Sequence, residues 1–158
     1  METPLLVSAC LVGFRCRYDG STKLDYRFLS TLESYSWFAV CPEQMAGFPT
    51  PRKAIFFVDG TGETVLRGEG RIYRSDGVDV TEALLKSCQA LVAQAARWGI
   101  EVGILKEKSP SCGVTCTYVK ERLVEGKGIF SALLSSRGMK IFSEETWRKV
   151  LEGKGRDF

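Results

Sequence analysis

The sequence predicts an α/β fold with a Rossmann-like, mostly parallel sheet, flanking helices and one β-hairpin excursion. Three apolar runs, in PLLVSAC, SWFAVCPE and GIEVGILKEKSPSC, are short and bounded by turn residues, as buried strands of a parallel sheet are. Segments with apolar residues at helical spacing separate these runs. Strands that alternate with helices favour right-handed crossovers, and a chain of 158 residues suits a single domain, which we place at 1–158.

The first half of the chain gives two strands, one helix and the hairpin. The first strand starts after Pro4, and the second ends at Pro42. Between them, KLDYRFLSTLESY carries apolar residues at 24, 28, 29 and 32, which predicts a helix. Asp-Gly and Gly turn signals lie between β-rich runs in AIFFVDGTGETVLRGEGRIYR, so this segment, residues 54–74, predicts the hairpin.

A long helix is expected next, with Thr81 as its N-cap, its end at Trp98 and Gly99 at the C′ position. Its apolar face is expected to point inward, and the third strand follows at about 101–106. That face consists of Leu84, Leu85, Cys88, Leu91, Val92 and Ala95.

The last part of the chain predicts a helix, a strand and a final helix. IFSALLSSRG reads as a helix that Gly138 ends, and MKIF as a strand. SEETWRKVLEG, residues 143–153, reads as the last helix, with Ser143 as its N-cap and two glutamates in its first turn.

Composition and charge exclude several classes of protein. No apolar stretch reaches the roughly 20 residues that cross a bilayer, and METPLLVSACLVG lacks the basic region of a signal peptide, so we expect a cytoplasmic protein without a membrane partner. The formal net charge is +3, and basic residues are interspersed with acidic ones. This balance permits a tRNA or other anionic partner but does not require one.

Three of the six cysteines follow predicted strands. Cys10, Cys41 and Cys112 each lie at, or a few residues beyond, the carboxyl end of a strand. Ligands of open α/β sheets bind at that edge, where the loops that leave the strands form a crevice. The three thiols can therefore meet in space.

Spacing and composition exclude familiar cysteine sites. The chain has no C-x-x-C pair, no zinc-ribbon spacing and no histidine, so a Cys₂His₂ site and a Cys–His nucleophile are both excluded. Three thiolates from separate strand ends suit a soft metal or an iron–sulfur cluster, and a [4Fe–4S] cluster with three protein ligands leaves one iron open. From the pattern alone, three buried core thiols are an equal alternative.

Two neighbours of these cysteines could act on a ligand of the open iron. Glu43 follows Cys41 by two residues, and Ser109 precedes Cys112 by three, each across a proline. Without histidine, acid–base work must come from Glu, Asp, Lys, Tyr or a thiol. The alternatives are an exposed turn glutamate and a serine that bonds its own turn.

Four further residues are assigned from their positions. Cys16 is expected to support the site, Cys88 to lie in the core, and Cys116 to be a spare thiol, with a ligand role as the weaker alternative. Arg52 either contacts substrate or fixes its loop at the surface.

Four motifs carry a resemblance to a known family. VSACLVGFRCRYDG, VCPEQMAGFPTPR, GVDVT and LKEKSPSCG, in this order, resemble the thiouracil desulfidase (TudS-like) family, a bacterial family long known only as a domain of unknown function. The resemblance implies a [4Fe–4S] cluster held by Cys10, Cys41 and Cys112. It also implies non-redox removal of sulfur from a thiolated pyrimidine by hydrolytic C–S cleavage, which gives the oxo base and hydrosulfide.

The resemblance further implies that Glu43 handles protons and that Ser109 assists as a hydrogen-bonding or relay partner. The substrate is expected to be a small thiobase, nucleoside or tRNA base. After Cys112 the chain departs from the family pattern, with VTCTYVKERLVEGKG in place of the usual segment, a loop expected to help close the site.

Two other functions remain open at this point. One is a thiol-redox protein in which Cys112 and Cys116, or Cys10 and Cys16, cycle as a dithiol. The other is a metal-stabilised module that binds RNA or another protein.

Overall fold

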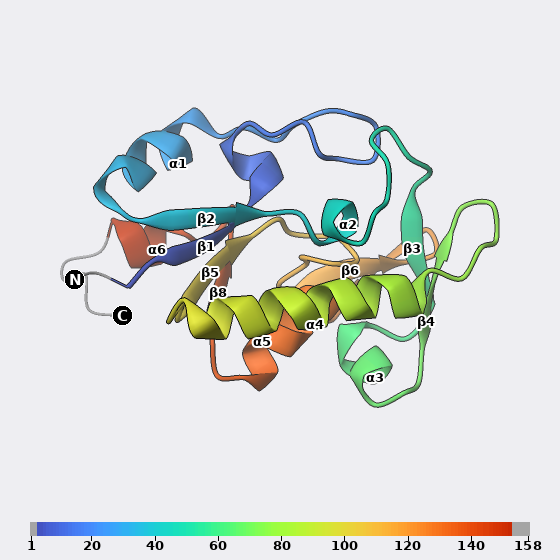
Figure 1. Ribbon diagram of the computed structural model, residues 1–158. Helices are drawn as coiled ribbons and strands as arrows, with labels where there is room; N and C mark the ends of the chain where they lie inside the picture. The colour runs from blue at the N-terminus through green and yellow to red at the C-terminus, as the bar shows by residue number, and fades with distance from the viewer. Residues whose placement is uncertain (1–2, 153–158) are drawn as a thin grey trace.

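A four-stranded parallel sheet forms the centre of the computed structural model, which describes residues 3–152 (Figure 1). The strand order is β2-β1-β5-β8, and each neighbouring pair is parallel. This confirms the predicted fold class. The four strands are β1 (Leu5–Ser8), β2 (Trp37–Val40), β5 (Val102–Leu105) and β8 (Lys140–Ser143).

Helices cover both faces of this sheet. Alternate side chains of β1 point to opposite faces, so they pack against different helices. Leu5 and Val7 pack in a cluster with residues of α1 and α6, whereas Leu6 packs with residues of α4 and α5. Figure 1 shows α4 and α5 together on one side of the sheet. The helices are α1 (Tyr26–Thr31), α4 (Thr81–Arg97), α5 (Ile129–Ser136) and α6 (Arg148–Leu151).

A second sheet lies beside the first, in the order β4-β3-β6-β7. The predicted hairpin is present as the antiparallel pair β3 and β4, with the short helix α3 between them. The hairpin of β6 and β7 was not predicted, and it occupies the segment expected to be a loop. The elements are β3 (Ile55–Asp59), α3 (Gly62–Leu66), β4 (Arg71–Arg74), β6 (Cys116–Val119) and β7 (Arg122–Glu125).

Two predicted helix caps were wrong. Thr81 is the first residue of α4 rather than its N-cap, and its hydroxyl pairs with the backbone of Ile72. Ser143 is the last residue of β8, where its Oγ accepts a hydrogen bond from the N–H of Glu145. The final helix is therefore only α6, and Gly153 of its predicted span lies outside the described residues.

The glycines that end α4 and α5 were predicted, whereas the cap of α1 was not. Asp25 caps α1 through a 3.0 Å bond from the N–H of Phe28. Gly99 and Gly138 follow α4 and α5 with left-handed backbone angles (φ +70° and +82°), which glycine adopts without strain. In residues 3–152 no helix is long and apolar enough to span a bilayer.

Candidate active site

The carboxyl ends of β1, β2 and β5 meet at one edge of the main sheet. From β1 the chain crosses to β2 on one side, and β5 pairs on the other side. Such a reversal of strand order opens a crevice between the loops that leave the central strands. The loops are a 3₁₀ turn, η1 (Ala9–Val12), the short helix α2 (Pro42–Met45) and the segment 106–115.

A pocket of about 530 Å³ lies at this edge. Its walls bring together all five residues that the sequence predicted for the site. Cys16, Arg52 and Ser111 also line it, as do Tyr118 and Lys120 of the β6–β7 hairpin. The predicted site residues are Cys10, Cys41, Glu43, Ser109 and Cys112.

The three strand-end cysteines occupy different supports around this pocket. Cys10 lies in η1, Cys41 immediately precedes α2, and Cys112 lies in the loop after β5. Cys10 and Cys112 are buried and Cys41 is half-buried; all three are free thiols. Burial raises the pKa of Cys112 to about 12, with nearby Cys41 and Glu43 adding to it and hydrogen bonds from Ser8 and Ser111 opposing it.

Cys16 lies at the same pocket, beside Cys10 and Cys41. A hydrogen bond with the Cys10 thiol raises the pKa of Cys16 to about 11, although a bond with the Cys41 thiol acts in the opposite direction. The bond to Cys16, together with burial, raises the pKa of Cys41 well above its usual range. Both shifts favour the protonated thiols of Cys16 and Cys41, whereas a bound metal would favour the thiolates.

The remaining two cysteines stand apart from the pocket. Cys88 is fully buried on α4 within the main core, as predicted. Cys116 starts β6 and lines a different hollow, beside Glu63 and Lys127.

Glu43 is held from two sides rather than exposed in a turn. Its Oε1 accepts a hydrogen bond from Arg52 Nε at 3.2 Å and forms an ion pair with Arg52 Nη2, also at 3.2 Å. Its Oε2 accepts a hydrogen bond from the hydroxyl of Ser111 at 3.0 Å. Both partners of the Glu43–Arg52 ion pair are largely buried, which strengthens the interaction relative to a surface pair.

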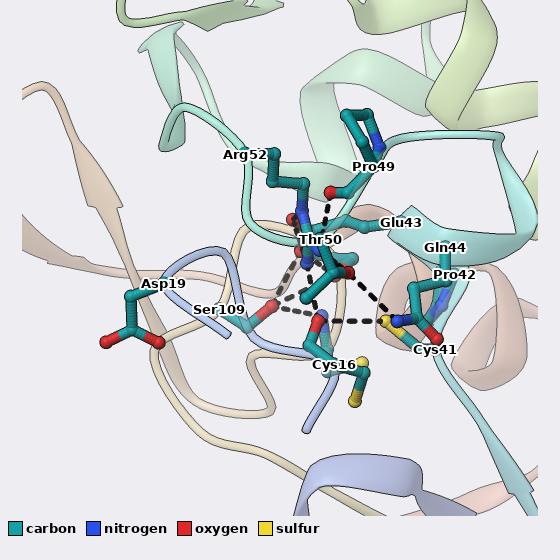
Figure 2. A network of polar contacts seen from close by, with 12 residues as sticks. Cys16, Asp19, Cys41, Pro42, Glu43, Gln44, Pro49, Thr50, Arg52 and Ser109 are labelled. Carbon is teal, nitrogen blue, oxygen red and sulfur yellow. Dashed lines mark hydrogen bonds and ion pairs between the residues drawn. The ribbon is translucent and has the colours of Figure 1, made fainter. Parts of the chain in front are cut away.

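Arg52 is a buried residue that fixes the site, not a surface arginine. Its side chain is 5% exposed, and besides Glu43 it donates to the carbonyl of Cys16 at 2.8 Å and to Thr50 Oγ1 at 3.0 Å. Figure 2 shows Arg52 between Glu43 and Cys16, whose carbonyl also accepts a bond from Cys41 Sγ at 3.8 Å. One guanidinium thus links three segments of the pocket wall.

Ser109 is bonded to its own turn and to a neighbouring hydroxyl. Its Oγ accepts hydrogen bonds from the N–H groups of Ser111 at 3.2 Å and Cys112 at 3.1 Å. The same Oγ lies 2.9 Å from Ser111 Oγ. Ser109 is therefore connected through Ser111 to Glu43.

A buried carboxylate holds the loop that carries Ser109 and Cys112. Oε1 of Glu107 accepts hydrogen bonds from the N–H groups of Val114 at 2.7 Å and Thr115 at 2.8 Å. It also accepts from Cys116 N–H at 3.2 Å, while Oε2 accepts from the Thr115 hydroxyl. Burial alone would raise the pKa of Glu107, but these bonds outweigh it and lower the pKa.

The other side of the loop docks on the start of α5. The N–H groups of Ile129 and Phe130 donate to the carbonyls of Pro110 and Ser111, both at 2.9 Å. Free N–H groups of a first helical turn need such acceptors. Gly128 permits this approach, because a Cβ there would lie 2.5 Å from the carbonyl carbon of Ser111.

Replacing Glu107 tests how the loop is held. Glu107→Ala leaves several buried N–H groups without an acceptor, so we expect the free energy of unfolding to fall by about 3 kcal/mol. Glu107→Gln keeps an acceptor oxygen and should cost about 1 kcal/mol. Urea unfolding measures both; equal, small losses would show that Glu107 does not hold the loop.

The lowered pKa of Glu107 also predicts a dependence on pH. A carboxyl whose pKa is depressed by folding stabilises the protein fully above its unfolded pKa, and this stabilisation is lost as the pH falls through the folded value. Glu107→Gln should therefore flatten the decline of stability in acid, below the ordinary carboxyl range.

A single metal ion does not fit the cysteines as they stand. Within residues 3–152, no three Cys, Asp or Glu side chains form a group that could hold one ion. The three strand-end thiols instead surround the pocket from separate elements.

Fold and site together define the class: a Rossmann-like α/β protein with a thiol-lined pocket at the switch point of its sheet. The family model described as 2-thiouracil desulfurase matches residues 5–146, and the chain belongs to that family. The resemblance seen in the four sequence motifs is thereby confirmed.

Two known proteins are similar to the chain over nearly its whole length. The uncharacterised protein YbbK of Bacillus subtilis (strain 168) is 35% identical over 150 residues, which is 93% of this chain and 99% of YbbK. The structure of a [4Fe–4S]-dependent thiouracil desulfidase, TudS, matches with a TM-score of 0.80 and 32% identity, over 94% of this chain and 95% of that one.

Sequence reasoning did not find Ser111 or Glu107, and it left the role of Arg52 open. Each acts through a contact that only the folded chain creates, such as the Ser111–Glu43 bond between residues 68 positions apart. The one signal available was the density of polar residues in LKEKSPSC.

Proposed function

We propose that this chain is a [4Fe–4S]-dependent desulfidase that converts a thiolated pyrimidine, such as 2-thiouracil, to its oxo form and hydrosulfide without net redox change. The observation that carries the proposal is the arrangement of Cys10, Cys41 and Cys112 around a pocket that also contains the connected side chains of Glu43 and Ser109. Family membership and the similarity to TudS support it.

The thiols suit a cluster better than a single ion. In an iron–sulfur cluster each thiolate binds a different iron, so the ligands must surround a space rather than converge on a point. Cys10, Cys41 and Cys112 meet this requirement, since they come from three elements and all line one pocket. Thiolates are also the soft ligands that iron–sulfur clusters use.

When bound, a cluster with three protein ligands supplies a Lewis-acidic iron that can polarise the C–S bond of the substrate. The chain supplies the remaining chemistry. Glu43 is the base that receives a proton from the attacking water and the acid that returns it to the departing sulfur. Arg52 fixes the orientation of the Glu43 carboxylate, and Ser109 orients the water.

The substrate is proposed to be a small thiobase or its nucleoside. The pocket volume of about 530 Å³ lies within the range typical of small-molecule sites, which supports a small substrate. Tyr118 and Lys120 of the β6–β7 hairpin also line the pocket, which supports a part for the segment after Cys112 in substrate binding. We further propose that residues 1–158 act as one such domain in the cytoplasm, where a reducing environment keeps the ligand thiols free.

Turnover of 2-thiouracil tests this function. The chain is reconstituted anaerobically with iron and sulfide, and uracil and hydrosulfide are measured without added oxidant or reductant. We expect the two products in a 1:1 ratio. Absence of sulfide release would point to a binding module. A requirement for a reductant, or equal activity without iron, would point to a thiol-redox protein that uses Cys10 and Cys16, whose thiols are hydrogen-bonded.

A further inference from the structure

A buried serine joins the two residues proposed to handle protons. Ser111 Oγ lies 2.9 Å from Ser109 Oγ and donates to Glu43 Oε2 at 3.0 Å. Ser111 is only 1% exposed, so solvent has almost no access to this hydrogen-bonded link. Ser109 and Glu43 do not hydrogen-bond to each other directly among the contacts of the described residues.

The hydrogen-bond pattern fixes which group donates at each step of the series from Ser109 through Ser111 to Glu43. A serine hydroxyl has one hydrogen to donate and two lone pairs to accept with. The N–H groups of Ser111 and Cys112 occupy the lone pairs of Ser109 Oγ. The hydrogen of Ser109 is thus left to point at Ser111 Oγ, because the hydrogen of Ser111 is used on the Glu43 carboxylate.

The same two N–H groups prepare Ser109 to lose its proton. Backbone N–H groups at 3.1–3.2 Å stabilise negative charge on an oxygen, as the donors of an oxyanion hole do. At the other end of this hydrogen-bonded series, Arg52 holds Oε1 of Glu43 (Figure 2). Oε2 is left for the hydroxyl of Ser111. A proton can therefore leave Ser109 only toward Ser111.

We propose that Ser111 is the relay through which a proton passes between Ser109 and Glu43 during desulfuration. The inference rests on the proposed function. It assigns to Ser111 a role in the reaction that neither its sequence position nor the family motif assigns.

The step balances without any redox partner. The proton of Ser109 passes to Ser111 and that of Ser111 to Glu43, which leaves on Ser109 Oγ an electron pair that neither N–H group occupies. Water adds its hydroxyl to the ring carbon and gives its proton to this pair. The C–S bond then breaks with its electron pair on sulfur, and the proton of Glu43 returns to the sulfur, which leaves as hydrosulfide. The second proton of water is released to solvent when the C=O bond forms.

Ser111→Ala breaks the relay and leaves Glu43, Ser109 and all six cysteines in the chain. We expect kcat for 2-thiouracil to fall by about 10²-fold with KM within about twofold of wild type, since general acid–base steps typically contribute 10²–10⁴-fold. Iron and labile sulfide per chain, and the melting temperature of the cluster-free chain, are measured on the same preparations. Ser111→Thr, which restores a hydroxyl, should recover part of kcat.

Ser87→Ala is the matched control. Ser87 is also a buried serine, and its hydroxyl donates to the carbonyl of Pro42, next to Glu43, at 2.7 Å. The Ser87→Ala variant loses a comparable buried hydrogen bond outside the relay. Its kcat should therefore stay near that of wild type, even if its melting temperature falls.

A double variant separates a relay from a structural role. Substitutions of residues that act together in one relay have non-additive effects on kcat. Ser109→Ala combined with Ser111→Ala should therefore lose no more activity than Ser109→Ala alone. Unchanged kcat in Ser111→Ala, or losses that multiply in the double variant, would overturn the relay. A wild-type chain with a full cluster that releases no sulfide would instead overturn the proposed function, and the relay with it.

Discussion

Replacing Cys10, Cys41 or Cys112 by serine should each abolish iron retention. The wild-type chain, reconstituted anaerobically, is expected to hold about four irons and four labile sulfides, and each variant close to none. The physical reason is that each thiol stands on a separate element at the pocket, so the loss of one leaves a cluster with only two of its three proposed protein ligands. Iron and sulfide assays together with the visible absorption of the cluster give the result.

Cys16 and Cys116 provide the controls for this prediction. Cys116 lies outside the pocket, and Cys116→Ser should keep a full cluster. Cys16 contacts Cys10 and Cys41 and gives the sharper comparison, because Cys16→Ser keeps a hydrogen-bonding group there and should also retain iron. Loss of iron in Cys16→Ser with retention in one of the three ligand variants would reassign that ligand.

Glu43→Gln should retain the cluster and lose most of the activity. The amide keeps an oxygen for Arg52 but cannot take up a proton at neutral pH, so kcat is expected to fall by about 10²–10⁴-fold. Sulfide release at saturating 2-thiouracil, normalised to iron content, measures the effect.

Glu63→Gln is the control for removal of a carboxylate. Glu63 also accepts backbone hydrogen bonds, from the N–H of Lys127 at 3.1 Å, but it lies on α3 away from the cysteine pocket. Its kcat per cluster should match that of wild type. A Glu43→Gln variant as active as Glu63→Gln would show that proton transfer does not pass through Glu43.

The sequence predicted the main sheet well because its signals are local. The strands of the first sheet are short apolar runs with clear stops, and the ends of α4 and α5 coincide with Gly99 and Gly138. The hairpin of β6 and β7 was missed, since its turn carries Lys120 at a positive φ of 56° instead of the glycine or asparagine that would mark it. The cap assigned to Thr81 failed because its hydroxyl bonds to Ile72 in β4, a tertiary contact.

The site was predictable in part for the same reason. Placing Cys10, Cys41 and Cys112 after strands was sufficient to expect them at one sheet edge, and the structure brings them to one pocket. The connections among the other side chains could not be read from spacing. The bonds of Arg52 to Cys16 and of Ser111 to Glu43 join segments that only the fold brings together, so their roles emerge from the three-dimensional arrangement.

The dependence of turnover on cluster content tests the central claim most directly. The chain is prepared with graded iron loading, from none to about four irons per chain, and the rate of sulfide release from 2-thiouracil is measured anaerobically at each level. We predict a rate proportional to the cluster absorption, with none in the iron-free chain. A rate that does not change with iron content, or one that persists in the iron-free chain, would contradict a cluster-dependent desulfidase.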